Sequence, residues 1–196
     1  MLTPLTPLKA LGSRSFEFFD QTGWFYLSTI LDDFSRYIIA WKLCTTMKAE
    51  DVTGTLELAL TASGCESAQV AHRPRLLSDN GSSYIAGDLA EWLEERGIRH
   101  IRGAPFHPQT QGKIERWHQT LKNRILFENY YLPGDLETQI NAFVDHYNHQ
   151  RYHEAIGNLT PADVYFGRGQ TILLERERIK RQTIQRRRLN HRAIAA

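Results

Sequence analysis

Two acidic residues have the types and local contexts that suit binding of a divalent metal ion. Asp79 closes an apolar run and precedes the turn-forming pair Asn80-Gly81, whereas Glu115 opens a helical pattern after a glycine-containing loop. The two acids have 35 residues between them, and Lys122 follows Glu115 by seven positions, two turns along the same helical face. Carboxylates from a strand end and from a helix, with a cation nearby, predict a metal ion held beside a phosphate backbone.

Strand and helix patterns along the chain predict the elements that must position these acids. The helix that carries Glu115 has a buried stripe of Ile114, Trp117, Leu121 and Ile125, and the loop 103–112 before it can move when a ligand arrives. Three strands, then helix-strand-helix-strand-helix, predict an α/β fold with a five-stranded mixed sheet and helices on both faces. The expected strands cover 13–19, 24–32, 36–43, 75–78 and 98–102, and the expected helices cover 52–64, 89–96, 114–125 and 136–147.

Four separated segments carry a specific family resemblance. They are LDDFSRYIIAW (31–41), LLSDNGSSY (76–84), HPQTQGKIERWHQTLK (107–122) and YNHQRYHEAIGNLTPADVYF (147–166). In this order and spacing they resemble the integrase catalytic core of bacterial insertion-sequence transposases, which are relatives of retroviral integrases. The resemblance covers roughly residues 23–168 and implies a ribonuclease-H-like fold. A single Ser-Asp-Asn-Gly segment would carry little weight by itself.

The resemblance also implies roles for the acids. The family has an Asp-Asp-Glu (DDE) triad with 35 residues between its second and third acids, so Asp79 matches the second acid and Glu115 the third. Lys122 matches the basic residue that the family carries seven positions after the Glu. The basic residues on the same helix, Lys113, Arg116, Lys122 and Arg124, are expected to contact DNA phosphates, and a merely solvated helix face is the alternative.

The first acid of the triad has no match. In the family it lies on the opening strand, and counting back from Asp32 without a gap leads to Ser13, whereas an alignment with an insertion puts Pro4 there. Glu17 and Asp20 are the nearest acids and are weak candidates for the third metal ligand. Glu17 lies about 13 Å along the strand from position 13, and Asp20 belongs to an expected hairpin turn. We therefore divide the chain into a degenerate or truncated segment 1–22, an integrase core 23–168 and a basic helical tail 169–196.

The resemblance is compatible with two functions, and the sequence alone does not exclude either of them. The first is a DDE-type polynucleotidyl transferase that uses Mg²⁺ or Mn²⁺ to cut DNA at element ends and join them to target DNA, as a homo-oligomer on DNA. The second, favoured by the missing acid, is a catalytically inactive remnant that binds DNA or oligomerises. A third hypothesis is a ribonuclease-H-like nuclease of another kind. The TPADVY segment (160–165) argues against it, because this segment resembles the transposase family. The family's upstream helix-turn-helix region is not found here, so no end or target sequence is predicted.

Charge is distributed unevenly. The chain has a net charge of +2, but residues 168–196 contain nine basic and two acidic residues, an excess of +7. An acidic body with a basic arm is typical of a protein that gains affinity for a nucleic-acid backbone from its tail, with a solvated terminal helix as the alternative. No apolar run approaches the 18 residues of a membrane span, so we expect no membrane partner. The family resemblance implies a bacterial cytoplasmic protein associated with the nucleoid.

Several other residue types invite a functional interpretation that we do not favour. Asp32 and Asp33 look like a catalytic pair but are expected to stabilise a turn through their own backbone. His146, His149 and His153 have a spacing compatible with zinc, but no carboxylate or Cys completes a site. Large aromatic residues are more often core than base-stacking platforms, and this applies to Trp117 and Tyr147. Cys44 and Cys65 have no metal or disulfide spacing and are expected to be core residues.

Overall fold

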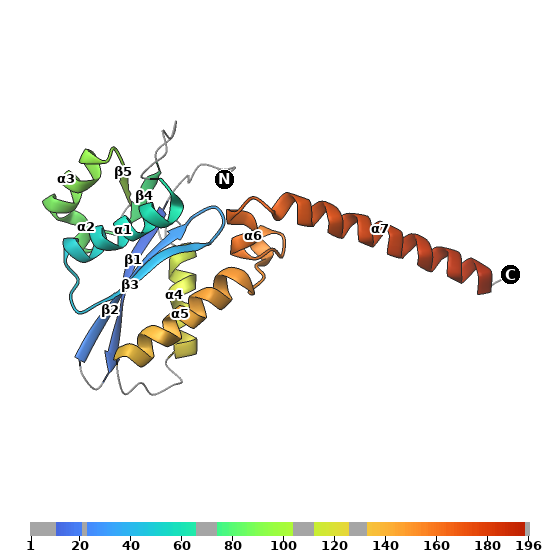
Figure 1. The fold of residues 1–196 in the computed structure, drawn as a ribbon, viewed down its shortest axis with the longest axis horizontal. Coiled ribbons are helices and arrows are strands. Elements are labelled where there is room, and N and C mark those ends of the chain that lie inside the picture. Colours follow the sequence, from blue (N-terminus) through green and yellow to red (C-terminus); the bar gives the residue numbers. More distant parts are fainter. Residues whose placement is uncertain (1–10, 21–22, 66–73, 104–111, 126–132, 195–196) are drawn as a thin grey trace.

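The computed structural model describes residues 11–20, 23–65, 74–103, 112–125 and 133–194. Its strands are β1 (Leu11–Asp20), β2 (Gly23–Asp32), β3 (Ile38–Cys44), β4 (Arg75–Ser78) and β5 (Arg99–Arg102). They pair in the order β3-β2-β1-β4-β5, as Figure 1 shows. The first three strands are antiparallel, and β4 runs parallel to both β1 and β5. The expected α/β class is confirmed, and each expected strand is present with ends that differ by at most two residues.

Helices cover both faces of the sheet because β2 carries apolar side chains on alternate sides. Ile30 packs with α1 (Ala49–Ser63), α2 (Ser82–Ile85) and α3 (Gly87–Glu95) in one core. Leu27 and Leu31 pack with α4 (Gly112–Ile125) and α5 (Pro133–His149) in the other. Successive strand residues point to opposite faces, so a strand that is buried on both faces needs apolar residues on both, as Ile30 on one face and Leu27 and Leu31 on the other supply. The two groups of helices lie on opposite sides of the strands in Figure 1.

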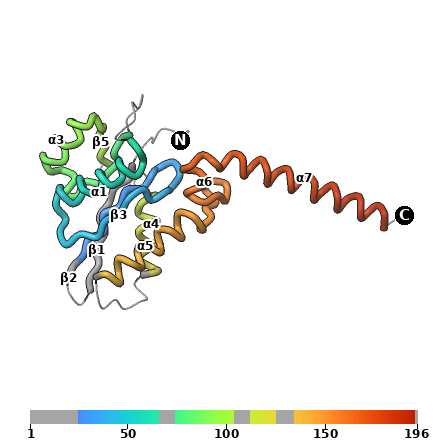
Figure 2. Tube along the Cα trace, in the orientation of Figure 1, coloured from blue at the N-terminus to red at the C-terminus, as the bar shows by residue number. Residues whose placement is uncertain are grey.

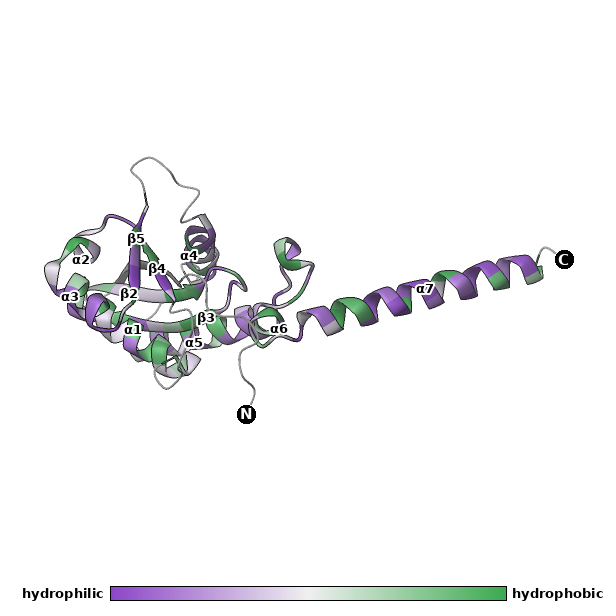
Figure 3. Cartoon of the chain, turned by 90° about the horizontal axis from the view of Figure 1, so that it is seen from above, coloured by the Kyte–Doolittle hydropathy of each residue, from purple (hydrophilic) through white to green (hydrophobic). Residues whose placement is uncertain are grey.

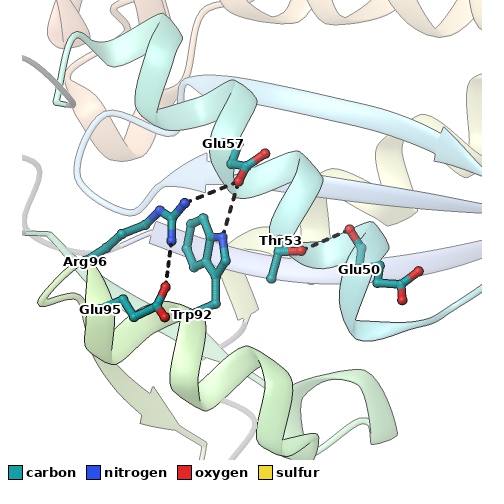
Figure 4. Close-up of polar contacts among 6 residues, drawn as sticks. All are labelled: Glu50, Thr53, Glu57, Trp92, Glu95 and Arg96. Carbon is teal, nitrogen blue, oxygen red and sulfur yellow. Dashed lines mark hydrogen bonds and ion pairs between the residues drawn. The ribbon is translucent and has the colours of Figure 1, made fainter.

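A polar cluster joins α1 to α3 at the surface (Figure 4). Glu57 of α1 accepts a hydrogen bond from Trp92 Nε1 at 3.3 Å and pairs with Arg96 at 3.4 Å. The guanidinium of Arg96 lies 4.0 Å from the centre of the Trp92 ring. Exposed ion pairs contribute little to stability, so the buried leucines beneath the cluster hold α3, and with it β5, against α1.

The turn after β2 is built by a buried carboxylate. Asp32 is 4% exposed, and its Oδ2 accepts hydrogen bonds from the Ser35 amide at 2.8 Å and the Ser35 hydroxyl at 2.5 Å. The next residue, Arg36, has a φ of 70°, a left-handed conformation that is uncommon outside glycine. These contacts agree with the structural role expected for Asp32.

One side chain of α5 pairs with the backbone at the start of β3. Asn148 accepts a hydrogen bond from the Ile38 amide at 2.9 Å and donates one to the Ile38 carbonyl at 3.0 Å. It thereby takes the place of a neighbouring strand. Asn148 is 4% exposed, so this pair of bonds lies in a region where unpaired backbone groups are costly.

Replacing Asn148 with Ala is expected to lower the free energy of unfolding by about 2–4 kcal/mol, because both buried backbone groups of Ile38 lose their partner. Urea unfolding followed by circular dichroism measures the change. Asn141→Ala is the matched control, since Asn141 lies on the same helix and is exposed. Its effect should stay within about 0.5 kcal/mol. Equal effects from both variants would contradict the edge-pairing role of Asn148.

The C-terminal part leaves the body as one long helix. A 3₁₀ turn (Glu154–Ile156) and α6 (Pro161–Tyr165) lead into α7 (Gly169–Ile194), which extends away from the sheet in Figures 1 and 2. Arg176 ties its start to the body by donating to the Asn158 carbonyl at 2.8 Å. Figure 3 shows α7 as mostly hydrophilic with scattered apolar residues, of which Leu174 is 62% exposed. None of the helices in the described ranges has the length and apolar character needed to cross a membrane.

Candidate functional site

Asp79 is presented at the carboxyl end of β4, where the strand leaves the sheet. Ser78 is fully buried, and its hydroxyl donates to the Asp79 carbonyl at 2.9 Å and lies 2.7 Å from His100 Nε2. Burial, with Arg102 nearby, lowers the pKa of His100. The amide of Gly103 donates to the Ser78 carbonyl at 3.0 Å and continues the pairing of β4 with β5. The backbone that leads to Asp79 is therefore held on the side of β5.

The Asp79 carboxylate is oriented by the turn that follows it. Its Oδ1 accepts a hydrogen bond from the Gly81 amide at 2.9 Å, which is the turn predicted from Asp79-Asn80-Gly81. A Cβ at position 81 would lie 3.0 Å from that same oxygen. Any larger residue at this position would push against the carboxylate, so Gly81 keeps the space in which Asp79 sits.

The register of β1 against β4 decides which residue of the opening strand lies beside Asp79. Ser13 pairs with Ser78, the residue directly before Asp79, and β4 pairs with β1 only over Leu11 to Ser13. Glu17 and Asp20 lie four and seven residues further along β1, at about 13 Å and 23 Å by strand rise. Asp20 pairs with Gly23 at the hairpin end. The register thus places both weak candidates for the third ligand away from Asp79, whereas residues 21–22 of the expected turn lie outside the described residues.

Glu115 lies in the first turn of α4, which packs over β1 and β2. Ile114, Trp117 and Leu121 are buried against the sheet, as the helical stripe predicted. His118, also buried, places its Nε2 3.4 Å from Thr29 Oγ1 of β2. Glu115 is half-buried beside this stripe. The helix that carries Glu115 therefore lies on β1, the strand that pairs with the end of β4.

The donor set available for a metal ion is small. The described residues contain no group of three His, Cys, Asp or Glu side chains placed to hold one ion. Two carboxylates, Asp79 and Glu115, remain as the expected ligands, and one or two carboxylates with water and a phosphate are a usual Mg²⁺ environment. The expected mobile loop before α4 lies, for residues 104–111, outside the described residues.

The four basic residues expected to contact DNA are not equivalent in the structure. Lys113 donates to Asp33 Oδ2 at 2.6 Å and to the Asp33 carbonyl at 2.9 Å, so its charge is largely balanced. Arg116 and Arg124 are exposed and Lys122 is half-buried. The Lys113–Asp33 pair spans 80 positions, and no sequence pattern indicated it.

The aromatic and histidine residues considered from the sequence are now placed. Trp117 is 1% and Tyr147 is 4% exposed, which confirms both as core residues. His149 approaches Asp145 at 3.9 Å, and His153 packs edge-on against Tyr147 with 4.9 Å between ring centres. These contacts are local and separate, and within the described ranges the histidines join no three-ligand metal group.

The sequence of the chain matches known families and relatives. A family model described as "Integrase core domain" matches residues 14–108, and a second with the same description matches 96–161. The transposase for insertion sequence element IS629 of Shigella sonnei is 28% identical over 142 residues, which is 72% of this chain and 46% of that protein. Transposase InsF for insertion sequence IS3A of Escherichia coli is 24% identical over 71% of this chain and 47% of its own. The chain therefore spans about half the length of these curated relatives.

Solved structures show the same fold. The HTLV-2 integrase catalytic core domain in complex with magnesium, in a trimeric form, aligns with a TM-score of 0.63 at 17% identity, over 83% of this chain and 99% of that one. The catalytic domain of Mos1 mariner transposase aligns with a TM-score of 0.60 at 16% identity, over 70% of each chain. At these identities the likeness concerns the fold.

Proposed function

We infer the function of this chain from its family, because it belongs to the integrase core family of insertion-sequence transposases. We propose that it binds DNA at a metal site formed by Asp79 and Glu115 and that strand transfer at this site is impaired. The observation that carries the proposal is the pairing of Ser13 with Ser78. It supports the proposal because the family resemblance implies the first acid of the triad at this position, where the sequence has Ser.

Metal binding by two carboxylates is chemically reasonable for a single ion. Asp79 comes from a strand end and is oriented by the Gly81 amide, whereas Glu115 comes from a helix that lies on the neighbouring strand. When bound, Mg²⁺ or Mn²⁺ would neutralise charge on a phosphodiester oxygen. Lys122, two turns beyond Glu115, would add a positive charge beside the phosphate. A second ion would need a further carboxylate, which neither Ser13 nor its neighbours in the β1–β4 ladder supply.

The alternative function, a DNA-binding or oligomerising protein without catalysis, is supported by the same Ser13 position and by the basic α7. Solved relatives include dimeric and trimeric forms of the HTLV-2 core, so a homo-oligomer on DNA is part of the proposal.

We also propose a different start for the core. β1 lies in the middle of the sheet order, so the core begins by Leu11 and not at residue 23, while the tail begins with α7 at Gly169.

Binding of Mn²⁺ tests the metal site without requiring catalysis. Titration of Mn²⁺ into the full chain by calorimetry should show a site whose affinity falls by more than about tenfold in Asp79→Asn and in Glu115→Gln, since even outer-shell changes cost about 10–100-fold. Asp88→Asn and Glu91→Gln are matched controls, because they remove the same charges from exposed positions on α3. If the controls weaken binding as much, or if Asp79→Asn has no effect, the metal-site proposal is wrong.

A further inference from the structure

A small cavity opens on a side of α4 that the acid pair does not use. Its volume is about 50 Å³, room for roughly a few water molecules or one tetrahedral oxyanion. At about 100° per residue, its α4 residues Lys113, Arg116, Trp117 and Thr120 share one face, and Glu115 lies about 150° from the middle of that face. The remaining lining residues come from the β2–β3 turn, the end of α5 and the segment after it: Arg36, Tyr147, Arg151, His153 and Ala155.

Three buried polar atoms of this lining have no hydrogen-bond partner in the described part of the chain. They are Arg36 Nε, Trp117 Nε1 and His153 Nε2. Trp117 is 1% exposed, so its indole N–H is shielded from bulk solvent. Buried donors are almost always paired in folded proteins. Two of the three atoms, Arg36 Nε and Trp117 Nε1, can only donate, which indicates that the cavity is built to receive a group that accepts hydrogen bonds.

The charge of the lining has one sign. Every ionisable lining residue is basic apart from Tyr147, and Lys113 is balanced by Asp33, which leaves Arg36, Arg116 and Arg151. Burial, with Arg151 and Arg36 close by, lowers the pKa of His153 to about 4, so its ring is neutral at pH 7. Burial raises the pKa of Tyr147 to about 12, so its hydroxyl keeps its proton. An anion would therefore meet three guanidinium groups and no competing carboxylate in the lining.

Arg36 is held in place by the turn before it. Its left-handed backbone, with a φ of 70°, follows directly on the Asp32–Ser35 hydrogen bonds that shape the turn. Such a conformation costs free energy and persists only where the surroundings enforce it. Here the residue with this unfavourable backbone conformation is Arg36, whose side chain lines the cavity.

We propose that this cavity binds one phosphate group of a nucleic-acid strand, at a point separate from Asp79 and Glu115. Arginine forks match the oxygens of a phosphate, and three of them converge here. The cavity is too small for a base, and the Trp117 ring is buried in the core, so the contact is to the backbone and carries no sequence preference. The choice of a nucleic acid rests on the proposed function, whereas the binding of a phosphate rests on the cavity alone.

Inorganic phosphate is the first probe. Titration into the ¹⁵N-labelled full chain at constant ionic strength should shift the indole N–H signal of Trp117 and the imidazole signals of His153, with saturation. Arg116→Gln and Arg151→Gln should each weaken phosphate binding by more than tenfold, whereas Arg124→Gln should not. Arg124 is the matched control because it is an exposed arginine on the same helix and outside the lining. Absence of a saturable shift, or equal losses in all three variants, overturns the proposal.

A DNA duplex is the second probe. The slope of log affinity against log salt concentration should become shallower by about 1 in Arg151→Gln, as expected for the loss of one phosphate contact. If phosphate binds but the slope and the DNA affinity are unchanged, the site serves another oxyanion and the nucleic-acid assignment is wrong. Binding of Mn²⁺ at Asp79 and Glu115 should be the same in Arg151→Gln and in the unmodified chain. The Mn²⁺ titration therefore tests the proposed metal site, and the phosphate titration tests the proposed phosphate-binding cavity, independently of each other.

Discussion

Ser13→Asp is expected to raise metal-dependent strand transfer from little or none by more than about 100-fold, since the loss of groups that only support metal ligands already costs about 10–100-fold. The physical reason is ligand count. A dinuclear Mg²⁺ site needs several carboxylates, and the β1–β4 register puts position 13 next to the residue before Asp79. The assay is cleavage and joining of DNA that carries the element ends, with Mg²⁺ or Mn²⁺, for the unmodified chain and the variant side by side.

Ser15→Asp is the matched control for this gain of activity. It makes the same substitution on the same strand, two residues beyond the end of the pairing with β4, and should restore nothing. Adding Asp79→Asn to Ser13→Asp should abolish the recovered activity. If the unmodified chain already transfers strands efficiently, and Glu17→Gln or Asp20→Asn removes that activity, then one of those acids is the third ligand and the proposed impairment is wrong.

Removal of residues 170–196 is expected to weaken non-specific DNA binding and to flatten its salt dependence by about 4–5 units of slope, at about 0.9 per phosphate contact. On α7, Arg178 and Arg181 pair with Glu175 and Glu177. Arg176 is bound to backbone carbonyls. The other five Lys and Arg residues of α7 have no ion pair within the described ranges and supply the expected contacts: Lys180, Arg186, Arg187, Arg188 and Arg192. Fluorescence anisotropy with a labelled duplex over a range of salt concentrations measures the slope.

A triple variant separates the charge of α7 from its presence. Arg186→Gln, Arg187→Gln and Arg188→Gln together should lower the slope by about 3 and leave the helix in place. Leu174→Gln changes an exposed residue of the same helix without changing charge and should leave the slope as it is. An unchanged slope after truncation would assign α7 to protein contacts.

Local pattern was sufficient for the elements that carry the acids. The stripe of Ile114, Trp117 and Leu121 repeats at helical spacing, so it predicted α4 and left Glu115 beside the buried face. The apolar run before Asp79 likewise predicted β4 at the residues where it is found. Periodicity of this kind comes from the burial of one element against another, and it can be recognised within a short stretch of consecutive residues.

The family resemblance and the absence of an acid at position 13 were also determined by the sequence, because motif order and spacing need no coordinates. Tertiary structure decided which residues became neighbours. Hydrogen bonding between strands selected Ser13 as the partner of Ser78, and packing brought Lys113 to Asp33. The phosphate cavity joins side chains from the β2–β3 turn, α4 and the segment after α5, so no window of sequence could have shown it. Such contacts depend on how the sheet and its helices close on each other, and that closure is set by the whole core at once.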